Sequence, residues 1–117
     1  MRDNQEYEEQ KLVVEYLEII GAKFTSIPNS TYTKSFAQKA INTASGLRSG
    51  LPDLFIIIKN KPFFIEMKRK VGGVTSRNQL DWITAINKCN GVQAYVCNGF
   101  DEAKLIIDKY KNLCETK

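Results

Sequence analysis

The feature that most constrains the fold of this chain is a pair of apolar runs that charged residues interrupt. Residues 54–58 and 63–67 are rich in isoleucine and phenylalanine, and the short polar stretch 59–62 between them predicts a β-hairpin. Asp53 stands at the start of the first run, and Glu66 and Lys68 fall at the end of the second, where a simple core strand would carry valine or isoleucine. These three polar residues need a reason other than the core.

The second strand places its charged residues on one face. Side chains two apart on a strand point the same way, so Phe64, Glu66 and Lys68 share one face, while Ile65 and Met67 share the other. The strand is therefore predicted to be half-buried, with a polar face directed at something other than the core.

A hairpin that brings the start of its first strand near the end of its second would set Asp53 beside Glu66. Two carboxylates that close repel each other unless a cation lies between them. A hard divalent ion with oxygen ligands, Mg²⁺ or Mn²⁺, fits such a pair and leaves positions for water and a substrate phosphate. The Lys68 ammonium could then position or deprotonate an attacking water, or offset charge on the phosphate.

The same residues have a plainer interpretation, a surface hairpin with an ordinary Glu–Lys pair that implies no chemistry. The context favours the metal site. Gly50, Leu51 and Pro52 form a rigid turn that presents Asp53 at a strand start, and the flanking apolar runs indicate a buried sheet.

Several separated motifs resemble those of the VRR-NUC (virus-type replication-repair nuclease) branch of the PD-(D/E)xK nuclease superfamily. The resemblance runs from about Glu6 to Ile107 and rests on Gly50-x-Pro52-Asp53-Leu54, Ile65-Glu66-x-Lys68-Arg69, Gly73, Ser76, Gln79, Trp82 and Gly91, in that order.

The resemblance implies roles for individual residues. Asp53 and Glu66 would ligate Mg²⁺, with Mn²⁺ able to substitute, and the carbonyl of Met67 would add a ligand. Lys68 would be the catalytic lysine, with Gln79 supporting the site from the next helix. In this family a glutamate near the start of the first helix also reaches the metal; Glu6 matches that spacing, with Glu9 as the substitute.

Two of these residues have equally good structural explanations. The acidic first turn that contains Glu6 suits the positive end of a helix dipole. Gln79 stands three residues after Ser76, the spacing of a capping box, in which Ser76 is the N-cap. Both interpretations stay open for each residue.

The remaining elements follow from periodicity and turn residues. We expect an amphipathic helix over 6–20, a strand over 23–27, a helix from Ser76 to about residue 90, a strand over 92–97, and a last helix capped by Asp101. Residues 30–49 read as a long connection with a short helical turn over 36–41. The order predicts an α/β fold over a single domain, 1–117, with the hairpin strands central in a mixed sheet flanked by helices. This resembles the restriction-endonuclease-like fold.

The charge of the chain suits a polyanionic partner. The formal net charge is +4, and the long connection interleaves basic residues with Tyr32 and Phe36, as a flap on nucleic acid would. A solvated loop with two aromatics on the core explains the same pattern. The candidate DNA-binding residues are Lys34, Lys39, Arg48, Arg69, Lys70 and Arg77.

Composition excludes several other classes. The chain has no histidine and three widely spaced cysteines, which removes zinc-finger spacing and Cys-His or Ser-His-Asp catalysis. No apolar run approaches the length that spans a bilayer, and the acidic start is unlike a signal peptide. We therefore expect a cytoplasmic protein with reduced cysteines and no membrane partner.

These observations predict Mg²⁺-dependent hydrolysis of DNA phosphodiesters. The chain resembles the viral and bacterial members that look like Holliday-junction resolvases, which implies branched DNA, a homodimer, and a bacterial or phage-infected cell. Tyr16, Phe36 and Tyr95 are candidate dimer contacts. A flap, end-processing or nicking nuclease of the same fold is one alternative, and a non-catalytic nucleic-acid-binding module is another.

Overall fold

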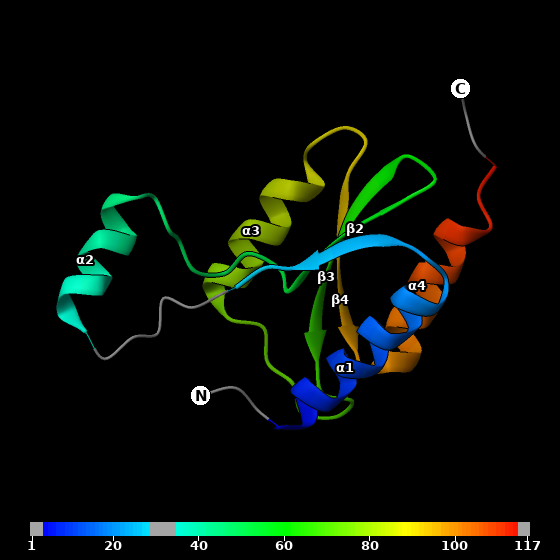
Figure 1. Ribbon diagram of the computed structural model, residues 1–117, viewed down its shortest axis with the longest axis horizontal. Helices are drawn as coiled ribbons and strands as arrows, with labels where there is room; N and C mark the ends of the chain where they lie inside the picture. The colour runs from blue at the N-terminus through cyan, green and yellow to red at the C-terminus, as the bar shows by residue number, and fades with distance from the viewer. Residues whose placement is uncertain (1–3, 29–34, 115–117) are drawn as a thin grey trace.

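The computed structural model describes residues 4–28 and 35–114 and forms a mixed sheet between helices (Figure 1). In chain order the elements are α1 (Asn4–Ile19), β1 (Lys23–Ser26), α2 (Phe36–Ala44), β2 (Leu54–Ile58), β3 (Lys61–Lys68), α3 (Arg77–Asn87), β4 (Gln93–Asn98) and α4 (Phe100–Lys111).

The hairpin strands are central, as the sequence predicts. The strand order is β1-β2-β3-β4, in which β1 and β2 pair antiparallel, β2 and β3 pair antiparallel, and β3 and β4 pair parallel. The parallel pair needs a crossover connection, and α3 supplies it. The α/β class with a mixed central sheet is confirmed.

The hydrophobic core lies on one face of this sheet. Helices α1 and α4 pack side by side there and bury Val13, Leu17 and Ile107 against the inward side chains of β3, Phe63 and Met67 (Figure 1). Helix α3 packs against β4 from the opposite side and buries only Ile86. The face of the sheet that carries Glu66 and Lys68 is therefore the face of α3.

The hairpin turn is tighter than the sequence pattern suggests. Strand β3 begins at Lys61, so the turn is only Lys59 and Asn60, both with positive φ, 51° and 65°. Two residues with positive φ form the type I′ turn, whose twist matches that of the flanking strands. The sequence did not indicate this turn type, because type I′ turns usually contain glycine and this one consists of Lys59 and Asn60.

The long connection contains a longer helix than the predicted turn over 36–41. Helix α2 runs from Phe36 to Ala44, and the Ser35 hydroxyl caps it by accepting a hydrogen bond from the Gln38 N–H at 3.1 Å. It stands apart from the sheet and the other helices (Figure 1) and buries none of its residues. Residues 29–34, which include Lys34 and Tyr32, lie outside the described residues.

The prediction that Asp101 caps the last helix is wrong. The N-cap position is Gly99, which has no side chain, and a carboxylate from another helix replaces the cap: Glu9 Oε1 accepts a hydrogen bond from the Phe100 N–H at 2.7 Å. A cap supplied from 91 residues away leaves no local sequence signal.

The three candidate dimer contacts differ in exposure. Tyr16 and Tyr95 are partly buried against the core, and their hydroxyls bond to Asp108 and Tyr110 respectively. Phe36 is 88% exposed. Cys89, Cys97 and Cys114 are not paired in disulfides in this structure. Over the described ranges, the helices are too short or too polar for a bilayer span.

Candidate active site

The hairpin brings Asp53, Glu66 and Lys68 together in a nearly closed environment. Asp53 leaves the turn after Pro52 just before β2, and its Oδ2 accepts a hydrogen bond from the Met67 N–H at 2.8 Å across the strands. The exposed fractions are 8% for Asp53, 1% for Glu66 and 5% for Lys68. The end of β3 is thus buried on both faces, more deeply than the half-buried strand that alternation predicts.

The surroundings of Glu66 disfavour its ionised form. Burial, and after it the neighbouring Asp53 charge, raise the pKa of Glu66 to about 8 against the opposing, lowering effect of Lys68. A hydrogen bond between the two carboxyl groups also favours the protonated form. That bond exists only when a proton is shared, so with both groups ionised the Glu66 Oε1 atom is buried without a partner in the described structure.

Lys68 is held by the next helix and by the carboxylate beside it. Its Nζ donates to Gln79 Oε1 at 2.9 Å and lies 3.5 Å from Glu66 Oε2. An ammonium has three donors. These two contacts use two of them, and the geometry therefore fixes the position of the cation and leaves a donor for water or phosphate.

Gln79 forms the predicted capping box and also contacts both charged groups of β3. Its Oε1 accepts from the Ser76 N–H at 2.9 Å, the Ser76 hydroxyl accepts from the Gln79 N–H, and together they form the capping box. The same side chain donates from Nε2 to Glu66 Oε2 at 2.9 Å. One amide therefore caps α3 and orients both charged groups of β3.

Two glycines allow the backbone to close around the site. Gly50 has φ +104°, and a Cβ there would lie 2.7 Å from the Asn78 backbone, so no other residue fits between the turn and α3. A Cβ at Gly73 would lie 2.9 Å from the Lys68 Cβ. Both glycines belong to the motifs that resemble the VRR-NUC family, and at each position the close neighbour explains why glycine is needed.

The Met67 backbone faces the same site. Its N–H donates to Asp53, and the N–H and C=O of one strand residue point to the same side of the strand. The Met67 carbonyl therefore points toward Asp53 as well. Asp53 lies on that side because the neighbouring strand, β2, begins one residue later, at Leu54.

The donor set suits a hard cation. Asp53 and Glu66 supply carboxylate oxygens and Met67 a carbonyl oxygen, the ligand types that Mg²⁺ and Mn²⁺ prefer. The unpartnered Glu66 Oε1 is the observation that supports the fit, because a buried carboxylate oxygen needs a proton or a positive charge.

The predicted third acidic ligand is not gathered with the other two. In the described part of the chain no three Asp, Glu, Cys or His side chains cluster. Glu6 lies in the first turn of α1, and α1 packs on the Met67 face of the sheet, opposite to the Glu66 face. Glu9 is engaged in capping α4.

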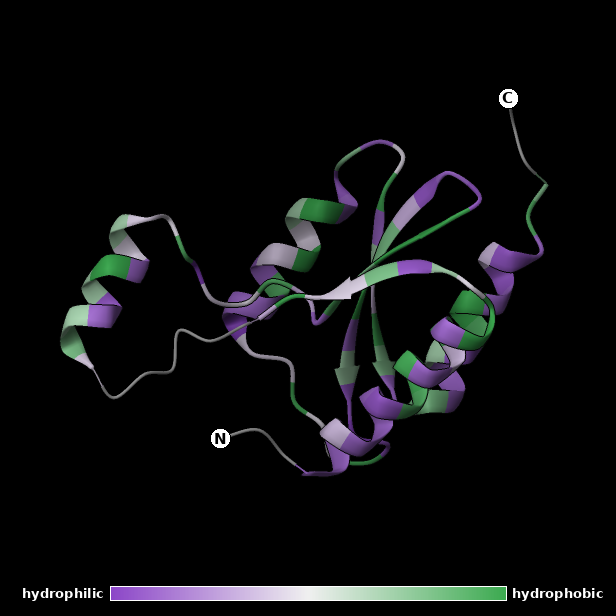
Figure 2. Cartoon of the chain, in the orientation of Figure 1, coloured by the Kyte–Doolittle hydropathy of each residue, from purple (hydrophilic) through white to green (hydrophobic). Residues whose placement is uncertain are grey.

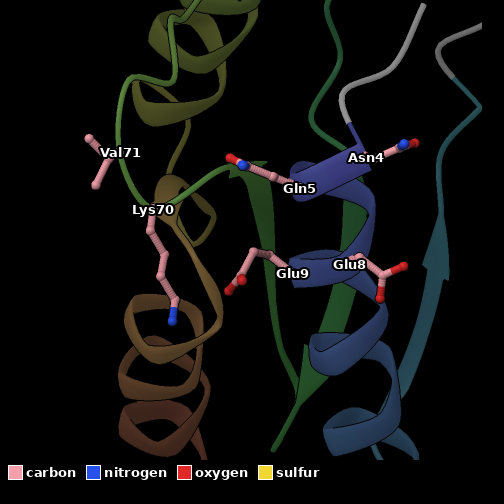
Figure 3. Close-up of a pocket in the computed structure, with 6 residues that line it drawn as sticks. All are labelled: Asn4, Gln5, Glu8, Glu9, Lys70 and Val71. Atoms are coloured by element: carbon pink, nitrogen blue, oxygen red, sulfur yellow. The ribbon is translucent and has the colours of Figure 1, made fainter.

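A cavity of about 520 Å³ separates the start of α1 from the turn after β3 (Figure 3). In Figure 3 the side chains of Gln5 and Glu9 extend from α1 toward the side of Lys70, and Glu8 points away. Glu9 and Lys70 both approach Gly99, at the N-terminus of α4. This cavity lies at a helix junction rather than beside Glu66.

The candidate DNA-binding residues fall into two groups. Arg69 and Lys70 follow β3 directly and Arg77 begins α3, so these three flank the site. Lys39 is exposed on α2, and Arg48 follows α2, where its guanidinium donates to the carbonyls of Thr43 and Leu47. Arg69 likewise donates to the Gly72 carbonyl at 3.0 Å.

Sequence reasoning missed the residues that fix the turn before Asp53. Asn78 Nδ2 donates to Ser49 Oγ at 2.8 Å, and Trp82 Nε1 donates to the Ser49 carbonyl at 3.1 Å. These bonds join α3 to the segment that presents Asp53. The exposed tryptophan on a helix was the available signal, since indole N–H groups near a surface usually bind an acceptor.

The chain matches the family model for the VRR-NUC domain over residues 2–101. It also resembles two solved structures at 24% identity. One, titled "VRR_NUC domain protein", superposes with a TM-score of 0.72 over 100% of this chain and 96% of that one. The other, titled "VRR_NUC domain", gives 0.66 over 91% and 97%. A comparison with curated proteins gave no match. At this identity the two structures establish the fold.

Proposed function

The chain belongs to the VRR-NUC family, and we propose from this premise that it is a Mg²⁺-dependent endonuclease that hydrolyses DNA phosphodiester bonds. The family implies a nuclease-type fold. One observation supports catalysis by this particular chain: a buried carboxylate pair with an unpartnered oxygen lies next to a fixed ammonium.

In this proposal Asp53, Glu66 and the Met67 carbonyl hold the ion. A bound Mg²⁺ would lower the pKa of its water and neutralise charge on the phosphate. Asp53 is kept in place by the Met67 N–H, and Glu66 by the Gln79 amide. These hydrogen bonds restrict both carboxylates and would preorganise the site for the ion.

Lys68 has a separate role. Its ammonium sits within 3.5 Å of Glu66, and the Gln79 carbonyl oxygen aims it. A fixed positive charge at this position would orient the attacking water and offset charge that develops on the phosphate oxygens. Arg69, Lys70 and Arg77 would bind the DNA backbone around the site.

We further propose a branched substrate and a homodimer. A four-way junction needs two symmetric cuts, which two identical sites related by a two-fold axis would make. Cutting of flaps or ends by a single site is the alternative, and it requires no dimer.

Cleavage of matched linear, flap and four-way-junction DNA, with and without Mg²⁺, tests the proposal. We expect Mg²⁺-dependent cutting that Asp53→Ala abolishes and that the exposed Asp81→Ala retains. DNA binding without cleavage on every substrate and with either metal would instead support the non-catalytic binding module. Cutting of flaps alone would move the function to end processing.

A further inference from the structure

Helix α2 carries an apolar stripe that packs on none of the other helices or strands of the described residues. At 100° per residue its hydrophobic side chains fall within an arc of about 140°, and the polar ones fill the rest. Figure 2 shows green, hydrophobic segments alternating with purple, hydrophilic ones along α2. Phe36 is 88% exposed and Ile41 is 58% exposed. A nine-residue helix is marginal in water without tertiary packing, so this stripe needs a partner. The stripe consists of Phe36, Ala37, Ala40, Ile41 and Ala44.

The connection after α2 holds the helix away from its own sheet. Three successive backbone bonds wind residues 45–47 back onto the helix, where Ser45, Gly46 and Leu47 donate to carbonyls of its last turns. The Arg48 guanidinium then donates to the carbonyls of Thr43 and Leu47, which links the end of α2 to the residues that follow it.

Ser49, the next residue, is fixed to α3 by Asn78 and Trp82. The wound segment and this anchor lie between α2 and β2, and α2 stands apart from the sheet (Figure 1).

The sheet offers a complementary surface. Register places Lys23, Thr25, Phe55 and Ile57 on the face that also carries Phe64 and Glu66. This face over β1 and β2 is hollowed by a cavity of about 350 Å³. The Phe55 and Phe64 rings lie side by side, with centroids 4.9 Å apart.

The other three helices pack on other parts of the sheet: α1 and α4 lie on its opposite face, and α3 packs on β4. An apolar sheet face and an amphipathic helix are the two layers that α/β proteins combine.

We propose that α2 of each copy packs on the Phe55–Phe64 face of a second copy, in a two-fold exchange of arms. Two reciprocal contacts, each with a phenylalanine and an isoleucine on either side, bury on the order of 1,000 Å², near the lower limit for a stable interface. This rests on the proposed nuclease function in one respect only: the exchanged helix would lie on the sheet face that carries Glu66, the face of the proposed site.

Molar mass by light scattering at micromolar concentration, without DNA, tests the exchange independently of cleavage. We expect the wild type to be a dimer. The double variant Phe36→Asp, Ile41→Asp should be monomeric, with the dissociation constant raised about 30-fold or more, because it removes central apolar contacts. Since α2 buries no residue, this variant should keep its fold. Ile19→Asp, at a residue that is 80% exposed on α1, is the matched control and should stay dimeric.

Mixing two defective variants tests which surfaces meet. Thr25→Glu places a charge on the receiving face at an exposed edge-strand residue, so it should be monomeric alone. The Thr25 variant has an unchanged α2, and the α2 variant has an unchanged Phe55–Phe64 face. When the two proteins are mixed, this α2 should pack on that face and a heterodimer should form. A monomeric wild type, a dimeric α2 variant, or a mixture that stays monomeric would each overturn the exchange. Wild-type cleavage that persists in any of these cases leaves the nuclease proposal standing.

Discussion

Replacing Glu66 by glutamine should make the metal-free protein more stable at neutral pH while it removes cleavage. The folded-state pKa of Glu66, about 8, lies above the unfolded value of 4.5. The folded state therefore holds this proton more tightly, and the corresponding stability is present below pH 4.5 and lost as the pH rises toward 8.

The size of the effect follows from linkage. Each pH unit between the two pKa values costs about 1.4 kcal/mol, so the penalty at pH 7 is about 3 kcal/mol. Glutamine cannot ionise, and its carbonyl can still accept from the Gln79 Nε2, while its amide can donate to Asp53. We expect Glu66→Gln to exceed the wild type by about 3 kcal/mol at pH 7, on the order of 10 °C in Tm, and to match it near pH 4.

Denaturant unfolding of the metal-free proteins at several pH values measures this difference. Glu15→Gln makes the same chemical change on an exposed position of α1 and should follow the wild type. Added Mg²⁺ should stabilise the wild type and the Glu15 variant but not Glu66→Gln, because ligand binding to the folded state adds to stability. Parallel pH curves for Glu66→Gln and the wild type would refute the reasoning.

Three further changes test the remaining parts of the site. Asp53→Ala should abolish Mg²⁺-dependent cleavage in a gel assay and lose about 1–3 kcal/mol in denaturant unfolding, because the buried Met67 N–H loses its acceptor; substantial residual activity would exclude Asp53 from the metal site. Lys68→Ala should lower kcat by roughly 10²–10³-fold with little change in DNA affinity, and Lys68→Arg should recover only part of it in single-turnover kinetics, since arginine does not reproduce the contacts of a compact ammonium. Wild-type rates in Lys68→Arg would reduce its role to a positive charge. Gln79→Glu keeps a residue that suits the capping box, so Tm should change little, but it puts an anion beside Glu66 and should lower kcat by about 10-fold or more; an unchanged kcat would assign Gln79 to capping alone.

The hairpin and the charged triplet could be predicted from sequence because their signals are local. Alternation placed Glu66 and Lys68 on one face, and the turn at Pro52 placed Asp53 at the strand start. The capping box of Ser76 and Gln79 was equally readable, since its two residues are three apart. The paired carboxylates also predicted a metal site, and the family resemblance added the Met67 carbonyl as a ligand and the support by Gln79.

Features that depend on distant residues escaped the sequence. The carboxylate of Glu9 caps α4 from another helix, and the anchor of Ser49 on Trp82 joins segments 33 residues apart. The depth of burial around Lys68 depends on how α3 docks, which periodicity does not report. The extent of α2 was missed because its residues include several moderate helix formers and, in the described structure, none of them is buried.

Helix α3 has a consequence for how the proposed active site would be lost on heating. It buries only Ile86, yet its first two turns carry Gln79 and the anchors of the Asp53 turn. Segments with few buried contacts open at lower free energy than the global core. Undocking of α3 would release both carboxylates and the ammonium at once while α1, α4 and the sheet stay folded. Thermal inactivation would then precede the loss of the fold, with reversible recovery on cooling, and the working temperature would be set by one helix rather than by the core.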